Sequence, residues 1–352
     1  MISTRKILSL QWIIAGVFFI THFIYFSIFN RYHLAYQESM QLFRYDWNYF
    51  MDYQSKPGGI SELSGAFLTQ FYINSLAGAC ILTLAGIAIY LLSVFIFRKY
   101  RIFGMIWSFI PVMIIGALQS DHLYTTGYTI GFLFTLVFIA IYISIPNDYL
   151  RYAMGFLGWF LLYLATGGFS LLASVLCIIH ELFTRKPFYY FLAAGYALIA
   201  LVLPYLVWRY IYYFPFSDVW LNPILFPGSG TTRYLLLLLV IYYPLLLILI
   251  QVWMMFSGKT QLIFNLNRIT ILIGMLVFIL SSWWVIKNAY DYKTELFFGI
   301  HQKVQQADWD GVLKLSSRYP GTHLLILYST NLALYKSGQL GDRMFNYNQV
   351  GP

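Results

Sequence analysis

The chain has 352 residues, of which 60% are hydrophobic and only 10% are charged, and its mean hydropathy is +0.68. Globular domains carry about one quarter charged residues and at most about half apolar ones, so this composition excludes an ordinary soluble enzyme. The net charge of +9 comes from basic residues in short segments between apolar runs. Such residues report membrane orientation, so nucleic acid is not an expected partner. We therefore expect a multi-pass membrane protein.

Apolar runs recur along the first 286 residues, and each approaches the roughly 20 residues that a helix needs to cross the hydrocarbon. The nine runs are 7–29, 76–97, 102–118, 128–145, 152–166, 169–183, 188–214, 234–256 and 269–286. The fifth and sixth are short and are separated only by Gly167 and Gly168, which predicts a helical hairpin. The sequence thus predicts an all-α protein with a transmembrane domain over 1–286 and a distinct segment over 287–352.

Basic residues indicate the orientation of these spans. With the N-terminus inside, ten fall on the inner side and five on the outer side before the tail. The inner set is Arg5, Lys6, Arg98, Lys99, Arg101, Arg151, Arg185, Lys186, Lys259 and Arg268, and the outer set is Arg31, Arg44, Lys56, Arg209 and Arg233. The positive-inside rule then predicts a bacterial inner-membrane protein with its C-terminus in the periplasm.

The acidic residues are distributed the other way. Of thirteen Asp and Glu, only Asp148 and Glu181 fall on the inner side. Acids contribute little to membrane orientation, so their position suggests chemistry on the outer face. The longer outer loops hold more of every polar residue, which is an alternative explanation for the same bias.

The first outer loop, residues 30–75, is much longer than a connection requires. Aromatic residues alternate there with Asp46 and Asp52, and residues 62–72 read as a short amphipathic helix. One of the two aspartates could act as a general base or metal ligand for a lipid-linked substrate. The alternative is an amphipathic elbow at the membrane interface whose acids are only solvated.

Two further outer segments carry candidate residues. Asp121 and His122 are adjacent at a helix end, where an aspartate could orient the imidazole or the pair could hold a divalent cation; a simple interfacial histidine bonded to its neighbour is the alternative. Arg209 ends the seventh run and could bind a lipid phosphate, although it could equally snorkel or pair with Asp218. The nearby turn 227–230 is glycine-rich and could cradle a phosphate, or could be only a flexible connection.

Other motifs carry little chemistry. Cys80 and Cys177 lie inside apolar runs without ligand spacing and are interpreted as packing residues. Lys259 imitates the end of a nucleotide-binding loop, but Trp253 stands where that loop requires its first glycine. Nucleotide binding is therefore not expected.

The segment after residue 286 has the polarity of a soluble region. Residues 302–317 and 322–336 read as two helices with Trp309 early and Pro320 between them. This pattern is typical of a tetratricopeptide repeat, and because one repeat cannot bury its own face, we expect a repeat array that is cut short.

Several short runs resemble an uncharacterised multi-pass membrane family of Bacteroidota. They begin at Gln41 (Gln-Leu-Phe), Lys56 (Lys-Pro-Gly-Gly-Ile), Phe67 (Phe-Leu-Thr-Gln-Phe-Tyr) and, in the tail, Asn331 (Asn-Leu-Ala-Leu-Tyr-Lys-Ser-Gly). The resemblance covers the whole chain and implies the inner membrane of a Gram-negative cell. It implies no activity.

The long first outer loop and the polar tail after the last span also resemble the plan of C-type (GT-C) glycosyltransferases. That resemblance implies Asp46 as the catalytic acid of the loop, Asp121 as its partner from the second loop, and Arg209 as a contact to a polyprenyl phosphate. The sequence departs from the family pattern at Asn48, where a second acid often stands.

We therefore expect transfer of a sugar from a polyprenyl-phosphate donor to an acceptor hydroxyl on the periplasmic face. Asp52, His122 and Asp218 join the candidates above, and Trp47 and Trp220 could stack on the sugar. No metal ligand set is predicted, and a divalent cation is left open. The alternatives are a scaffold that presents tetratricopeptide-like repeats to periplasmic proteins and, less in keeping with the lack of an inverted repeat, a transporter or lipid flippase.

Overall fold

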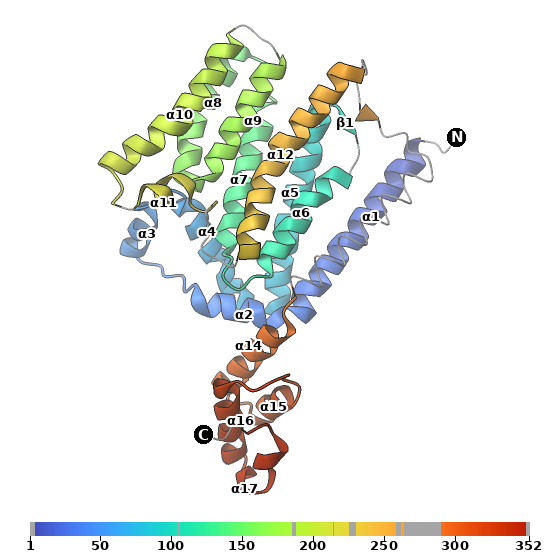
Figure 1. Ribbon diagram of the computed structural model, residues 1–352, viewed down its shortest axis with the longest axis vertical. Helices are drawn as coiled ribbons and strands as arrows, with labels where there is room; N and C mark the ends of the chain where they lie inside the picture. Colours follow the sequence, from blue (N-terminus) through green and yellow to red (C-terminus); the bar gives the residue numbers. More distant parts are fainter. Residues whose placement is uncertain are drawn as a thin grey trace.

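The computed structural model describes residues 4–103, 106–184, 188–213, 215–224, 230–257, 262–263 and 290–349. Within them the chain is almost entirely helical, which confirms the expected fold class at that level (Figure 1). The exception in these ranges is a parallel pair of two-residue strands, β1 (Ile102–Phe103) and β2 (Leu262–Ile263). The expected ninth span, 269–286, and the glycine-rich turn 227–230 fall largely or wholly outside the described residues.

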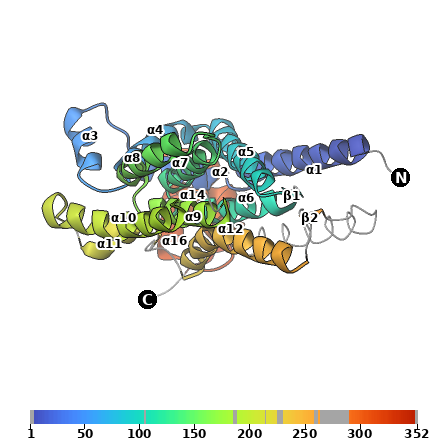
Figure 2. The same ribbon diagram turned by 90° about the horizontal axis from the view of Figure 1, so that it is seen from above.

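A bundle of apolar helices forms the larger part of the structure. Its members are α1 (Thr4–Ile24) with a π-helical end η1 (Tyr25–Phe29), α5 (Ser75–Lys99), α6 (Ile106–Gln119), α7 (Thr126–Tyr142), α8 (Asp148–Thr166), α9 (Phe169–Thr184), α10 (Tyr189–Tyr210) and α12 (Gly230–Ser257). Most of their buried side chains form one hydrophobic core, and a smaller cluster includes Phe26 of η1 with Ala79 and Leu82 of α5. Figure 2 shows α1 projecting away from the other helices.

Within the described ranges, four helical segments are long and apolar enough to cross a membrane, which is compatible with a membrane protein. They are Trp12–Phe29, Ser75–Lys99, Tyr189–Tyr210 and Thr232–Phe256. The expectation of nine spans is not met there, because α6, α7 and α9 have only 14, 17 and 16 residues. At 1.5 Å per residue they are about 21 to 26 Å long, short of the roughly 30 Å of hydrocarbon. Helix α8 is longer, but Asp148 and Arg151 at its start lower its hydropathy.

Gly167 and Gly168 turn the chain between α8 and α9, as the sequence predicts. Gly167 has φ +61°, a conformation that favours glycine. The backbone N–H of Gly168 donates to the carbonyl oxygen of Asn222 at 2.7 Å, and a Cβ on Gly167 would lie 2.7 Å from the same oxygen. The turn therefore needs glycine because the segment after α11 (Phe216–Leu221) packs directly against it.

The first outer loop is helical over much of its length. It contains α2 (Arg31–Met40), α3 (Trp47–Gln54), α4 (Gly59–Thr69) and a 3-10 turn η2 (Gln70–Ile73). Helix α4 packs against α7 and α8, and a Cβ on Gly65 of α4 would lie 2.2 Å from the nitrogen of Gly127 in α7. Figure 1 shows α2, α3, α4 and α11 at the opposite end of the bundle from β1. Following the orientation predicted from the basic residues, we name the first of these the outer end and the second the inner end.

Phe, Trp and Tyr make up 20% of the sequence, and part of this aromatic content is internal. Among the described residues, seven of the twelve largest fully buried side chains are tyrosines. Tyr72 shares a hydrogen bond with Thr126 at 2.8 Å, and Tyr163 donates to the carbonyl oxygen of Val219 at 3.0 Å. Because a buried hydroxyl requires a partner, these side chains join helices at defined positions as well as filling the core.

The tail forms a small helical unit with its own hydrophobic core. It consists of α14 (Tyr292–Gln305), α15 (Trp309–Ser316), α16 (Leu324–Lys336), α17 (Leu340–Arg343) and the 3-10 turn η3 (Met344–Asn346). The predicted helix 302–317 is wrong, because the chain breaks at Ala307, which has φ +53°, and Asp308 begins a new helix by accepting from the Gly311 N–H at 2.9 Å. The predicted helix 322–336 agrees with α16.

Candidate functional site

The turn between α6 and α7 brings together Asp121 and His122, two residues that the sequence singles out. The Asp121 Oδ1 accepts from the backbone N–H of Leu123 at 2.9 Å and lies 3.6 Å from His122 Nδ1. The other carboxylate oxygen accepts from the hydroxyl of Thr232, at the start of α12. The Asp121 side chain is 16% exposed and that of His122 is 42% exposed. The pair is thus held in place on one side and open to solvent on the other.

Helix α2 packs against this turn. The side-chain amide of Gln37 donates to the carbonyl oxygen of Tyr124 at 3.0 Å. His33 is buried beside the pair, and within the described residues its Nε2 has no hydrogen-bond partner. Burial lowers the pKa of His33 to about 4, and the positive charge that His122 can carry acts in the same direction. A neutral imidazole with an unused nitrogen therefore lies next to the Asp121–His122 pair.

The tail is attached to the same place. The carboxylate of Glu295 in α14 accepts from the backbone N–H groups of Tyr32 at 2.8 Å and His33 at 3.0 Å, which are otherwise unpaired donors at the start of α2. Phe298 stacks on Tyr36 with ring centroids 3.9 Å apart. Burial raises the pKa of Glu295 to about 7, although the two backbone donors favour the carboxylate.

The acids predicted on the first loop lie elsewhere. Asp46 is half-buried and immediately precedes α3, while Asp52 on α3 is exposed. Trp47 is 74% exposed. Neither aspartate side chain makes an ion pair within the described part of the chain. Helix α3 is packed on α4, so these residues form a separate surface group.

The third group of predicted residues lies around α10 and α11. Arg209 and Asp218 are both exposed, and no ion pair joins them in the described ranges. Trp220 donates its indole N–H to the carbonyl oxygen of Ala200 at 3.2 Å and stacks on Phe216 with centroids 5.7 Å apart. The structure therefore places Asp121 beside His122 and places Arg209 on the helix that packs against α11, and within the described ranges no hydrogen bond or ion pair joins these residues to Asp46 or Asp52.

Sequence reasoning missed an ion pair within the first loop. Glu62 in α4 pairs with Lys56, and the Asn222 side-chain amide donates to its Oε1 at 3.3 Å. Glu62 is only 15% exposed. The two charged residues lie six positions apart on either side of a Pro-Gly-Gly break, so helical spacing gave no signal for the pair.

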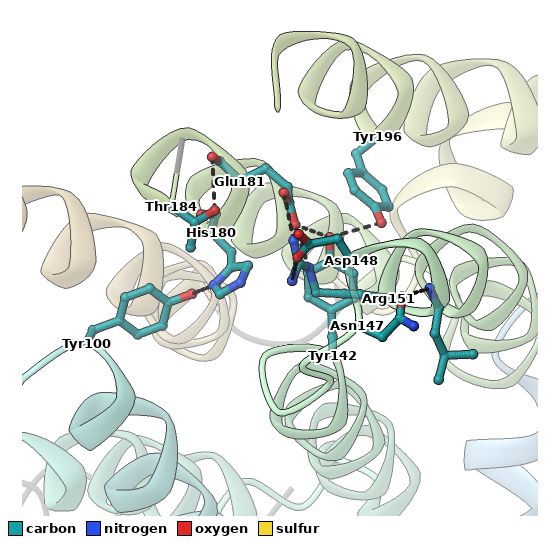
Figure 3. Close-up of polar contacts among 10 residues, drawn as sticks. Tyr100, Tyr142, Asn147, Asp148, Arg151, His180, Glu181, Thr184 and Tyr196 are labelled. Atoms are coloured by element: carbon teal, nitrogen blue, oxygen red, sulfur yellow. Dashed lines mark hydrogen bonds and ion pairs between the residues drawn. The ribbon is translucent and has the colours of Figure 1, made fainter. Parts of the chain in front are cut away.

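A second missed cluster lies at the inner end (Figure 3). Glu181 of α9 is fully buried and accepts from Arg151 Nε at 3.0 Å and from the Tyr142 hydroxyl at 2.7 Å. Arg151 Nη1 also reaches Asp148 at 2.8 Å, and Tyr196 donates to the Tyr142 hydroxyl at 3.1 Å. The sequence did contain a signal for this cluster, namely the two acids on the inner side, Asp148 and Glu181. In the structure both of them pair with Arg151.

No group of three or more His, Cys, Asp or Glu side chains within the described residues could hold a metal ion. The Asp121–His122 pair supplies at most two such ligands in that part of the chain.

Comparison with known proteins identifies the family. A family model described as a family of unknown function, DUF6057, matches residues 5–352. The chain belongs to this family. No curated protein and no solved structure matches it. The arrangement of the outer and inner clusters in this DUF6057 chain is therefore interpreted from its own residues.

Proposed function

We propose that the protein is an inner-membrane glycosyltransferase of GT-C type that uses a polyprenyl-phosphate-linked sugar at its outer, periplasmic end. The observation that carries the proposal is the Asp121 carboxylate, which is held by Leu123 and Thr232 and lies beside His122 and the neutral, buried His33. A general base must be fixed in position and still be reachable by the substrate. The hydrogen bonds from Leu123 and Thr232 fix the Asp121 carboxylate, and the exposure of the Asp121–His122 pair leaves it reachable. The plan of a GT-C enzyme, with its folded first loop and polar tail, agrees with the helices α2 to α4 and α14 to α17.

In this proposal Asp121 removes the proton of the acceptor hydroxyl as that oxygen bonds to the sugar. The bond between the sugar carbon and the phosphate oxygen breaks, and the polyprenyl phosphate leaves with the electron pair. Arg209, Trp47 and Trp220, which the sequence predicts as phosphate and sugar contacts, have no contact with Asp121 among the described residues, so this proposal gives them no part at the reacting atoms. Asp46 and Asp52 are the competing bases, since the GT-C resemblance favours Asp46.

The experiment compares four single variants in membranes supplied with a labelled polyprenyl-phosphate sugar. Asp121→Asn removes the base but keeps an oxygen for the Leu123 N–H, and we expect sugar transfer to fall about 100-fold or more. Asp46→Asn and Asp52→Asn assign the alternatives, and Asp148→Asn at the inner end is the matched control. If transfer survives unchanged in all three outer variants, the transferase proposal is refuted. Loss of sugar transfer in Asp46→Asn alone would assign the general base to Asp46 in the first loop.

A second candidate is a scaffold whose tetratricopeptide-like tail binds periplasmic proteins. The observation that favours it is the exposed apolar side of α16, with Leu324, Tyr328 and Tyr335 between 65% and 72% exposed. Such a surface on a soluble segment is typical of a protein interaction site. A chain ending after Gln305 retains α14 and its contact with α2, yet lacks α15 to α17. A scaffold loses its partners in that variant, whereas a transferase retains sugar transfer.

A further inference from the structure

A cleft of about 580 Å³ opens at the inner end, where the last turns of α5, α9 and α12 meet. Its lining includes Lys99, Arg101 and His180 together with Met254 and Met255. The cleft therefore combines cationic and apolar surfaces. It lies at the opposite end of the bundle from the Asp121–His122 pair, and nothing in the proposed transfer reaction uses it.

The charge of the cleft is positive. No acidic side chain belongs to the described residues that line it. The nearest inner-end acids, Asp148 and Glu181, both bond to Arg151, so their charge is countered within the protein. An anion entering the cleft would therefore meet a positive field, to which the cationic side chains of Lys99 and Arg101 both contribute.

The rear of the cleft is preorganised. The Tyr100 hydroxyl lies 3.0 Å from His180 Nδ1, and the Thr184 hydroxyl donates to the His180 carbonyl oxygen at 2.9 Å. Figure 3 shows Tyr100 and His180 pointing toward one another, apart from the Arg151–Glu181 contact. Polar groups held in this way bind a ligand without first having to be ordered.

The position of the cleft indicates the ligand. Two candidate membrane spans end beside it, one at Lys99 and the other at Phe256. Cations at the ends of membrane helices lie at the depth of lipid headgroups, and basic pockets between such helices bind anionic headgroups. Beyond the cleft, Val252 is 40% exposed and Phe256 is 89% exposed on α12, which provides an apolar surface for an acyl chain.

We propose that this cleft binds an anionic phospholipid of the inner leaflet, with its phosphate between Lys99 and Arg101 and an acyl chain along α12. The site is independent of the chemistry at the outer end. It would make the protein sensitive to the anionic lipid content of its membrane.

The test measures lipid binding to the purified full chain in neutral detergent by native mass spectrometry. Wild type should bind phosphatidylglycerol at least tenfold more tightly than phosphatidylcholine. The double variant Lys99→Gln/Arg101→Gln should lose this preference. Arg98→Gln is the matched control, because Arg98 is exposed next to Lys99 but does not line the cleft, and it should bind like wild type.

Three results would overturn the proposal. The first is an equal affinity of wild type for the two lipids, and the second is an equal loss in Arg98→Gln and in the double variant, which would show a general charge effect. The third is binding of glycerol 3-phosphate as tightly as phosphatidylglycerol, which would identify a site for soluble phosphate compounds. Thermal unfolding checks that the variants fold. Should the double variant fail this check, Met255→Asp places a negative charge on the cleft rim and should weaken phosphatidylglycerol binding at least tenfold.

Discussion

The two ends of the helical bundle differ in whether their charged side chains are buried or exposed. At the inner end, Arg151 and Glu181 are buried and satisfy one another within the protein. At the outer end, Asp52, Arg209 and Asp218 are exposed, and the Asp121–His122 pair is open to solvent on the side of His122. A buried pair makes the inner end dependent on its partners, whereas exposed groups leave the outer end free to meet a ligand.

The largest expected effect tests the inner end. Replacing Arg151 by alanine leaves the fully buried Glu181 without its cation, so we expect the free energy of unfolding to fall by about 3 to 5 kcal/mol. Thermal or denaturant unfolding of the detergent-solubilised protein measures this loss. Asp148→Ala is the control, because that side chain is 28% exposed and its removal should cost about 1 kcal/mol or less. Equal losses in the two variants would contradict the comparison.

The next effect concerns the contact that fixes the first loop on the bundle. Gly65→Ala introduces a methyl group 2.2 Å from the backbone nitrogen of Gly127, so α4 and α7 must separate. We expect a loss of about 1 to 3 kcal/mol in the free energy of unfolding. Gly16→Ala in α1 is the matched control, since its Cβ would meet no atom within 4 Å, and it should be neutral or slightly stabilising. Unchanged stability in Gly65→Ala would show that the close approach is not maintained.

A third prediction concerns pH at the outer end. The pKa of Glu295 is raised by burial from 4.5 to about 7 in the folded protein, so its favourable contribution is complete below pH 4.5 and is lost as the pH rises through about 7. Docking of α14 on α2 should therefore weaken by about 2 kcal/mol between pH 5 and pH 8. Hydrogen exchange of the tail amides measures the docking. His33 lies in the same contact, and because burial lowers its pKa from 6.5 to about 4, exposure of this imidazole on undocking would oppose the effect below about pH 6.5.

Glu295→Gln separates this carboxyl from the other titrating groups. The amide oxygen can still accept one of the two N–H bonds, so the tail should dock in a manner almost independent of pH. A tail that opens equally with pH in wild type and in Glu295→Gln would assign the dependence to another group.

The smallest expected effect tests the buried tyrosines. Tyr163→Phe keeps the ring but removes the hydrogen bond to the Val219 carbonyl oxygen, and we expect a loss of about 1 kcal/mol by thermal unfolding. Tyr205→Phe is the control, because that ring is 50% exposed on α10. A larger loss in the control would mean that the hydroxyl of Tyr163 contributes little.

The sequence predicts features that depend on neighbouring residues and fails for those that depend on distant ones. The helical class, the turn at Gly167 and Gly168 and the Asp121–His122 pair all follow from local patterns. Whether an apolar run is long enough to span depends on where its helix starts and stops. The pairing of Glu62 with Asn222 joins segments 160 positions apart, which no spacing rule reveals.

The packing of α4 against α7 and α8 has a consequence for the order in which the chain can fold during synthesis. The residues that receive α4 are made well after it, and the carbonyl oxygen of Asn222 that binds the Gly167–Gly168 turn is made later still. The first loop therefore cannot complete its packing until the chain has been synthesised past residue 222. We expect stalled nascent chains ending before α7 to be cleaved by protease within residues 59–69 and those extending past residue 224 to be protected.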